Sequence, residues 1–557
     1  MDSNSIWKRA LRKKSVEQLH DESSDRDLAG HSLHKSLNLF DLTCFGIAAV
    51  VGAGIFSTLG KAAADGGPAV AVLFLLTAVA CLFSALCYSE FASRIPVSGS
   101  AYTYSYVVFG ELVAWLIGWN LLMEYAIGNS VVAFSWSDYF SNLLVGIGVP
   151  LPDWLQTDYL SCSLAAAKTE GLDASETKLL EIWSQAPMLG GVKIIFDLPA
   201  LALNLVITTL VYIGIHESKL VSNAMVALKL SVVFGIIVVG VFYVTPANWV
   251  PFAPNGATGV LKGIAAVFFT YIGFDAISTT AEECKNPKRD LPRATMLTLG
   301  ICTVLYMILA FVLTGMVHYS ELRVDDPLAI VFSKHNLHWL SGIVSLSAVV
   351  AMASVFLVFQ LGQPRIFMSM SRDGLLPKPF SRIHPKFKTP SFATIVTGIA
   401  VALPILFLNS QLVTDLSALG TLFAFVLVSG GILALHTSDR QNNIETTGFR
   451  VPYINGQYIV IALLAAYTYL MRSMPENHDL TRDWSWDKFP YLVFYSVFIV
   501  LAIATWRKRW SVIPVLGVIT NLYLIAGIGH WNWLRFAVWC LIGIVIYAVT
   551  LMCKNTK

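Results

Sequence analysis

The sequence predicts an all-α membrane protein whose core contains two broken helices, and three observations support this fold class. Hydrophobic residues make up 56% of the 557 residues and charged residues 13%, which is more apolar surface than a soluble domain can bury. The apolar residues form repeated runs of about 20 residues, the length that crosses the roughly 30 Å hydrocarbon core of a bilayer. Glycines interrupt two of these runs near their centres, in the first run and in the sixth.

The apolar runs give fourteen expected membrane-spanning helices. The first ten lie near 41–62, 69–93, 109–135, 198–216, 220–245, 259–279, 294–317, 340–368, 391–409 and 413–436, and four more lie near 456–472, 489–506, 511–528 and 532–552. The expected organisation is a cytoplasmic N-terminal tail (1–38), a first group of five helices (39–245), a second group of five (246–436), and a C-terminal group that ends in a short cytoplasmic tail (437–557).

Lys and Arg residues in the short loops indicate the orientation, because cytoplasmic loops carry an excess of them. With the N-terminus inside, the basic clusters at 285–293, 372–388 and 507–509 all fall on the cytoplasmic side. The acidic segment at 146–197 and the loop near 476–479 then fall on the far side. We therefore expect a multi-pass protein of the plasma membrane or bacterial inner membrane, with both termini in the cytoplasm and no cleaved signal peptide.

Several function classes are excluded by composition and motifs. A net charge of +3 does not indicate a nucleic-acid partner. The eight cysteines show no metal-ligand spacing and no disulfide framework, so we interpret them as small core residues. The sequence contains no Walker motif and no nucleophile elbow. We expect no enzyme activity, no catalytic residue, no metal site and no cofactor.

The first broken helix lies in the segment IAAVVGAGIF at 47–56, where Gly52 and Gly54 place two poor helix formers near the centre of an apolar run. A helix that opens there exposes backbone donors and acceptors inside the bilayer, which is tolerated where they line a cavity or hold a ligand. Close helix packing is the other explanation for two glycines at this place.

The sixth run repeats the feature, with Gly273 at the centre of FFTYIGFDA at 268–276. Broken helices five spans apart predict two five-helix repeats, and an odd number of spans per repeat forces the second repeat to lie inverted in the membrane. This architecture is typical of transporters.

Two ionisable residues lie deep within expected spans. Glu124 is about twelve residues into the third span, roughly 18 Å deep, and its role is either an interhelical hydrogen bond or the handling of protons or substrate. Lys229 lies about nine residues into the fifth span, too deep to reach the interface fully, which favours a functional role over snorkelling. Glu90, beside Arg94, and Asp275 lie near span ends, where structural pairing is expected.

The chain resembles the cationic amino acid transporter family of the amino acid, polyamine and organocation superfamily over nearly its whole length. The resemblance is carried by GIAAVVGAGIF at 46–56, GWNLLMEYAIG at 118–128, FFTYIGFDAISTTAEECKNPKRDLP at 268–292, GQPRIFMSMSRDGLLP at 362–377 and GFRVP at 448–452. It does not cover the tail before about residue 35 or the segment at 146–197. The four helices after GFRVP resemble the longer, fourteen-span members, and the extra pair carries no readable chemistry.

The resemblance implies a LeuT-like fold, a 5+5 inverted repeat with discontinuous first and sixth helices around a substrate site. Backbone amides near Gly52, Ala53 and Gly54 would receive a carboxylate, and carbonyls around Val50 and from Phe269 through Thr270 and Tyr271 to Ile272 would receive an ammonium group. The side chains of Phe269, Thr270 and Tyr271 would lie nearest the pocket.

The family has a lysine in the fifth span at the place that sodium occupies in sodium-coupled relatives of the fold, and Lys229 matches it. An ammonium group there would repel sodium and could exchange a proton. The resemblance implies proton-coupled, sodium-independent transport of L-amino acids, cationic or neutral, by alternating access, with Glu124 as a second coupling candidate. The alternatives are a polyamine or organocation carrier and an amino acid sensor without net transport. A partner subunit is left open.

Overall fold

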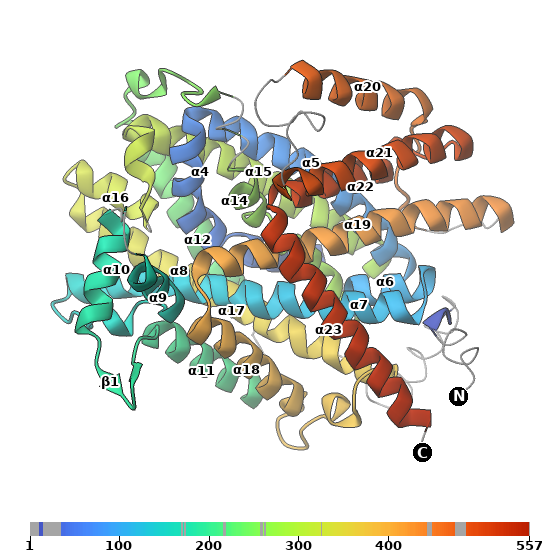
Figure 1. Ribbon diagram of the computed structural model, residues 1–557, viewed down its shortest axis with the longest axis horizontal. Coiled ribbons are helices and arrows are strands. Elements are labelled where there is room, and N and C mark those ends of the chain that lie inside the picture. The colour runs from blue at the N-terminus through green and yellow to red at the C-terminus, as the bar shows by residue number, and fades with distance from the viewer. Residues whose placement is uncertain are drawn as a thin grey trace.

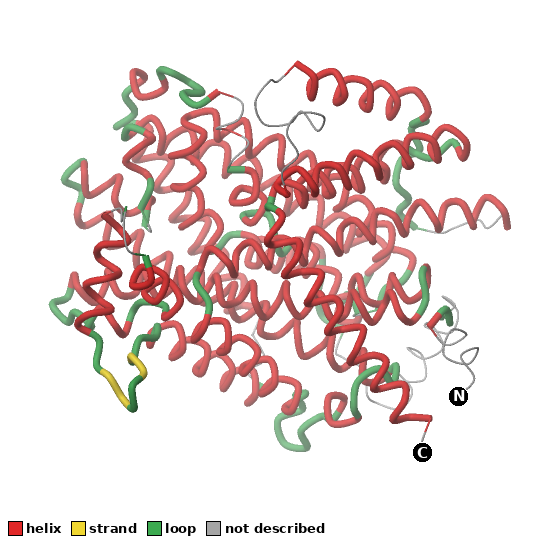
Figure 2. The backbone as a smooth tube through the Cα atoms, in the orientation of Figure 1, coloured by secondary structure: helices red, strands yellow, loops and turns green. Residues whose placement is uncertain are grey.

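The computed structural model describes residues 10–14, 35–97, 99–168, 171, 174–214, 219–256, 260, 263–324, 326–442, 448–473 and 486–555. The described chain is almost entirely helical, and many of its long helices run side by side along the longest axis of the molecule (Figures 1 and 2). The prediction of a mostly helical protein is confirmed. A short hairpin of two two-residue strands, β1 (Met188–Leu189) paired with β2 (Val192–Lys193), departs from the all-helical expectation.

Most of the helices coincide with the apolar runs of the sequence. In the first half they are α3 (Leu39–Val50), α4 (Leu59–Gly66), α5 (Val70–Arg94), α6 (Ser100–Val108), α7 (Glu111–Leu122), α8 (Gly128–Gly146), α9 (Tyr159–Ala167), α10 (Ala174–Gln185), α11 (Leu198–Ile213) and α12 (Lys219–Val241). One-turn π-helical segments, η1 (Gly54–Thr58) and η3 (Met123–Ile127), lead into α4 and join α7 to α8.

The second half continues in the same way. Its helices are α14 (Ile264–Phe269), α15 (Pro287–Met316), α16 (Pro327–Lys334), α17 (His338–Arg372), α18 (Ser391–Phe407), α19 (Ser410–Asn442), α20 (Gln457–Ser473), α21 (Phe489–Lys508), α22 (Val512–Gly527) and α23 (His530–Asn555), with a 3₁₀ helix, η6 (Phe274–Glu283), after α14. Shorter 3₁₀ turns are η2 (Gly67–Ala69), η4 (Asp153–Leu155), η5 (Pro246–Trp249), η7 (Tyr319–Leu322), η8 (Lys378–Ser381) and η9 (Trp486–Lys488).

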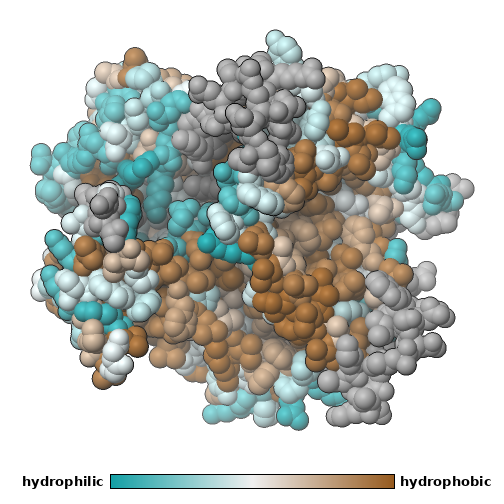
Figure 3. Space-filling model, viewed as in Figure 1, coloured by the Kyte–Doolittle hydropathy of each residue, from teal (hydrophilic) through white to brown (hydrophobic). Residues whose placement is uncertain are grey.

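The apolar helices of the described chain support a membrane location. By length and composition, six helical stretches could cross a membrane, and five shorter helices are also apolar. The first of the six runs from Leu39 to Arg94 and therefore contains two of the expected spans. Apolar side chains gather over α23 on the face shown in Figure 3, and this helix exposes Leu534, Val538, Leu541, Val545 and Val549. An exposed apolar surface of this kind is stable in contact with lipid tails.

Helices that lie five expected spans apart pack against one another. α5 packs on α15, α8 on α17, and α11 on α18, while α3 contacts η6. These four contacts pair the second, third, fourth and first expected spans with the seventh, eighth, ninth and sixth. The interrupted α3 and α14 segments therefore lie together at the centre of the bundle.

The C-terminal end of α5 is tied by a buried carboxylate. Glu90 is fully buried, and its Oε1 lies 2.6 Å from the Arg94 guanidinium and 2.8 Å from His436 Nε2 on α19. The backbone amide of Val451 donates to Glu90 Oε2 at 2.8 Å. The predicted structural pairing of Glu90 with Arg94 is confirmed, and the carboxylate also joins α5 to α19.

A short piece of the N-terminal tail, residues 10–14, is fixed to the same end of the bundle. The guanidinium of Arg12 donates to Glu111 at 2.9 Å, and Lys14 Nζ donates to Asp373 at 2.7 Å. Expected tail residues 1–9 and 15–34, and the far-side loop charges near 476–479, lie outside the described residues.

Candidate functional site

The first interrupted helix opens where the glycines predict. α3 ends at Val50, and Val51 adopts an extended conformation with φ −79° and ψ 94°. The chain resumes a helical path at Ala53. Among the described residues, the amides of Gly52, Ala53 and Gly54 donate to no backbone carbonyl. Three adjacent amides at a helix start are suited to an anionic group.

Side chains from three other helices bond the carbonyls around this opening. Lys229 on α12 is buried, and its Nζ lies 3.0 Å from the carbonyl oxygen of Ala48 and 3.1 Å from that of Val51. Tyr306 on α15 donates its hydroxyl to the carbonyl of Val50 at 3.0 Å. Tyr139 on α8 donates to the carbonyl of Phe56, beyond the opening, at 2.7 Å.

The second interrupted helix opens between α14 and η6. Gly273 adopts φ +114°, a conformation that L side chains rarely take. The amides of Thr270, Tyr271 and Ile272 donate to carbonyls three residues earlier, at 2.9–3.3 Å. The carbonyls of these three residues accept no hydrogen bond from other described residues. This set of carbonyls is suited to a positively charged or hydrogen-bond-donating group.

The glycines also allow the two openings to approach each other. A Cβ added to Gly54 would lie 2.5 Å from Thr270 Cα, and one added to Gly273 would lie 3.0 Å from the carbonyl oxygen of Ala49. A Cβ on Gly52 would lie 2.4 Å from Val355 of α17. The helix therefore opens beside Gly52, and the glycines also allow its neighbours to pack closely.

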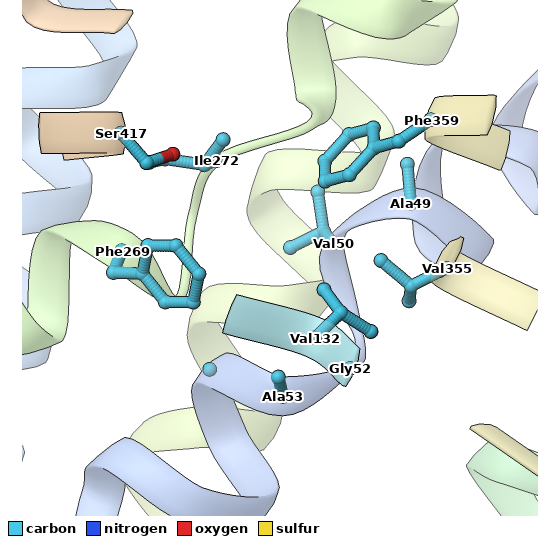
Figure 4. Close-up of a pocket in the computed structure, with 11 residues that line it drawn as sticks. Ala49, Val50, Gly52, Ala53, Val132, Phe269, Ile272, Val355, Phe359 and Ser417 are labelled. Atoms are coloured by element: carbon cyan, nitrogen blue, oxygen red, sulfur yellow. The ribbon is translucent and has the colours of Figure 1, made fainter. Parts of the chain in front are cut away.

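A small pocket lies between the two openings, and its free space of about 10 Å³ is close to that of one water molecule. Its lining is mostly apolar, and Figure 4 shows side chains from several helices converging on it. The lining residues are Ala49, Val50, Gly52, Ala53, Gly54, Val132, Phe269, Ile272, Val355, Phe359 and Ser417.

Six of the predicted substrate-binding residues line this pocket: Val50, Gly52, Ala53, Gly54, Phe269 and Ile272. The expectation for the side chains of Thr270 and Tyr271 is not met. The Thr270 hydroxyl donates to the Val267 carbonyl at 2.6 Å, and the Tyr271 hydroxyl donates to the Phe74 carbonyl at 3.0 Å. Both side chains are used to hold the opening and its packing.

The remaining walls come from helices without any sequence signal for a site. Val132 lies on α8, Val355 and Phe359 on α17, and Ser417 on α19. Each lies within a long apolar helix, where nothing in the sequence separates a pocket-facing position from a packed one. The rotation of each helix about its own axis decides which of its side chains face the pocket.

Glu124 lies outside the lining, one helical turn from Gly128 on the third expected span. It is 1% exposed, interacts electrostatically with Asp275, and has an oxygen, Oε2, with no hydrogen-bond partner among the described residues. Asp275 is 2% exposed, and its neighbour is the Tyr125 hydroxyl at 3.5 Å. Asp275 is expected from the sequence to lie near a span end with a structural partner, but η6 continues inside the bundle and buries the side chain beside the third span.

Comparison with known proteins identifies the class to which this geometry belongs. The family model for amino acid permeases matches residues 37–503, and the model for the C-terminus of such permeases matches residues 512–553. The chain belongs to the amino acid permease family. The family match covers both interrupted helices and every wall of the pocket.

Curated relatives of this permease include several named transporters. The branched-chain amino acid permease BcaP of Bacillus subtilis (strain 168) is 37% identical over 538 residues, covering 96% of each chain. The methylthioribose transporter of the same organism is 40% identical over 467 residues, covering 84% of this chain and 93% of the relative. The vacuolar cationic amino acid transporter 4 of Arabidopsis thaliana is 32% identical over 606 residues, covering 96% and 94%.

The resemblance to cationic amino acid transporters and the exclusion of an enzyme are both confirmed by these matches. The permease is a multi-pass membrane protein of a family that carries amino acids. The substrate named for each relative differs, so family membership alone does not choose among them.

Proposed function

We propose that this permease is a secondary active transporter of L-amino acids that works by alternating access. The observation that carries the proposal is the pairing of unpartnered backbone groups at the two openings. Three amides without backbone partners at 52–54 face the site from one opening, and three carbonyls without partners at 270–272 belong to the other. An amino acid presents one anionic and one cationic group on a single carbon, which suits this pairing.

The proposed architecture is a LeuT-like 5+5 inverted repeat, with repeats at 39–245 and 246–436 and four C-terminal helices, fourteen spans in all. Two facts support it. The helix interruptions occur in the first and sixth expected spans, and four pairs of helices that lie five spans apart pack against each other. Movement of the helices that contain the openings against α8 and α17 would expose the pocket to each side in turn.

Lys229 is the proposed coupling residue. Its ammonium group donates to two carbonyls of the first opening, so loss of its proton would remove positive charge from the point where α3 ends. A cation fixed there would also exclude sodium by repulsion. We therefore propose proton-coupled, sodium-independent transport. Glu124, buried beside Asp275, is a second candidate for carrying a proton.

The pocket walls favour a neutral substrate over a cationic one. The lining described above has no acidic side chain, and Glu124 lies outside it. A cationic side chain would enter an apolar space without a carboxylate to offset its desolvation. The same argument disfavours a polyamine. The relative named as a methylthioribose transporter supplies a second candidate, an uncharged sugar thioether, which the apolar walls would also accept.

The loop charges support the proposed orientation in the cell membrane, with both termini in the cytoplasm. Lys14, in the N-terminal tail, forms an ion pair with Asp373, which follows α17 in the basic segment at 372–388. The Glu90–Arg94 pair lies at the same end of the bundle. A cysteine accessibility experiment with a membrane-impermeant reagent tests the orientation, using a cysteine placed at Lys193 and another at Lys508. Labelling of position 193 and protection of position 508 in intact cells is the expected result.

Uptake by proteoliposomes tests the function. Full-length protein is reconstituted and supplied with radiolabelled alanine, leucine or arginine, with and without an inward proton gradient and with sodium replaced by potassium. We expect gradient-driven uptake of leucine and alanine that exceeds uptake of arginine and does not require sodium. Uptake that requires sodium would contradict the coupling proposal, and no uptake of any amino acid would contradict the function.

The second candidate is separated by competition. Excess unlabelled methylthioribose is added to the alanine and leucine assays, and radiolabelled methylthioribose is tested directly. Amino acid uptake that persists under this competition supports the leading proposal. Uptake of methylthioribose without uptake of amino acids favours the sugar thioether.

A further inference from the structure

Ser417 supplies the polar side chain in the described lining of the pocket. It lies on α19 and is fully buried, and its Oγ has no hydrogen-bond partner among the described residues. The other lining residues are Gly, Ala, Val, Ile and Phe. Other buried hydroxyls, such as those of Ser89 and Thr505, also lack a partner among the described residues. Ser417 differs from them because it lines the pocket, where a bound molecule could be its partner.

The helix itself does not use this hydroxyl. Thr414 and Thr421 on the same helix donate to the carbonyls four residues earlier, at 2.8 and 3.1 Å. Ser and Thr hydroxyls within helices commonly donate this local hydrogen bond. The Ser417 side chain points instead toward Ile272 and the pocket (Figure 4).

Gly128 on α8 packs closely against this side chain, and a Cβ added there would lie 2.8 Å from Ser417 Oγ. The absence of a side chain at Gly128 lets the hydroxyl stand at the edge of the pocket. Val355 and Phe359 form an apolar wall on α17. A side chain bound in this space would meet apolar groups together with one hydroxyl.

We propose that Ser417 determines substrate specificity by hydrogen bonding to a polar atom on the side chain of the bound amino acid. The proposal rests on the proposed function, in which backbone groups of the two openings hold the carboxylate and ammonium common to all amino acids. The hydroxyl then distinguishes substrates of the same shape. Threonine and valine are such a pair, because they differ by a hydroxyl in place of a methyl group.

The test compares Ser417→Ala and Ser417→Cys with the wild-type chain in proteoliposomes. The measured quantity is the concentration of unlabelled threonine or valine that halves uptake of radiolabelled alanine. We expect each variant to lower the preference for threonine relative to valine by about two- to tenfold, the range of one net hydrogen bond. Cys is included because it retains side-chain bulk while its S–H is a weak donor.

Ser429→Ala is the matched control. Ser429 lies on the same helix, is fully buried and is absent from the pocket lining, so its loss should leave the ratio unchanged. An unchanged ratio in both Ser417 variants would overturn the proposal. An equal loss for threonine and valine would overturn it as well, because the hydroxyl would then hold the groups common to both. Absence of uptake by the wild-type chain would instead count against the proposed function.

Discussion

The first and sixth interrupted helices reach the same pocket but hold their open backbone in different ways. At the first opening, the carbonyls of Ala48, Val50 and Val51 accept hydrogen bonds from Lys229 and Tyr306 on other helices. At the second, the amides from Thr270 to Ile272 bond to carbonyls three residues earlier, and Gly273 turns the chain at positive φ.

The difference indicates which opening responds to the rest of the bundle. A backbone held by side chains of α12 and α15 changes when those helices move or when a side chain loses a proton. A backbone held by its own short turns moves as a unit. We therefore expect the first opening to link coupling to closure, and the sixth to act as a preformed half of the site.

Gly54→Ala should have the largest effect, because it acts where the two openings touch. The added Cβ would lie 2.5 Å from Thr270 Cα, a backbone atom that cannot move aside without displacing the sixth span. We expect a loss of about 3 kcal/mol or more in the free energy of unfolding, above the usual range for overpacking, together with loss of transport. Thermal unfolding in detergent and uptake assays measure both.

Gly300→Ala is the control for that change. Gly300 lies in α15, and outside its chain neighbours and the backbone of its own helix no atom lies within 4 Å of an added Cβ, so alanine should leave stability equal or slightly higher. A Gly54→Ala protein as stable as the control would show that the openings do not pack as closely as the structure has them.

Lys229→Met should have the next largest effect, and it should act on the first opening without altering the sixth. It leaves the buried carbonyls of Ala48 and Val51 without this donor while it removes the cost of burying a charge. We expect a net loss of about 2 kcal/mol in stability and loss of the response of uptake to a proton gradient. Proteoliposome uptake at matched and unmatched pH measures the coupling.

Lys193→Met controls for removal of a lysine, since Lys193 lies in the β1–β2 hairpin and is absent from the pocket lining. If gradient-driven uptake survives in Lys229→Met, Lys229 is not the coupling residue. Its hydrogen bonds to the first opening would then have a structural role only.

Tyr306→Phe should have a smaller effect at the same opening. The substitution removes the 3.0 Å hydrogen bond to the Val50 carbonyl but keeps the ring that packs against Phe74 and Tyr271. We expect a loss of about 1 to 2 kcal/mol, because a buried carbonyl loses its donor. Thermal unfolding measures this loss of stability. Tyr495→Phe is the control, because Tyr495 lies on α21, which contains neither opening. Equal stability of Tyr306→Phe and wild type would mean that the Val50 carbonyl does not depend on this donor.

The sequence predicts the openings well and the walls poorly. Gly52, Gly54 and Gly273 mark both openings because glycine has a distinct backbone role, and Lys229 is conspicuous because a charge inside an apolar run is costly. Ser417 and Phe359 carry no comparable signal, since hydroxyls and aromatic rings are ordinary in apolar helices. The side chains of Thr270 and Tyr271 could not be oriented, because an opened segment has no helical period from which to infer a direction.

Thr270→Val should have the smallest effect and tests whether the sixth opening holds itself. The hydroxyl of Thr270 donates to the Val267 carbonyl, but the amide of the same residue already donates to that carbonyl at 3.1 Å. Removal of the hydroxyl therefore leaves no carbonyl without a donor, and we expect a loss of about 0.5 kcal/mol, below that of Tyr306→Phe. Both variants are unfolded side by side in the same detergent. If Thr270→Val costs as much as Tyr306→Phe, the amide turns do not suffice, and the sixth opening depends on side chains as the first one does.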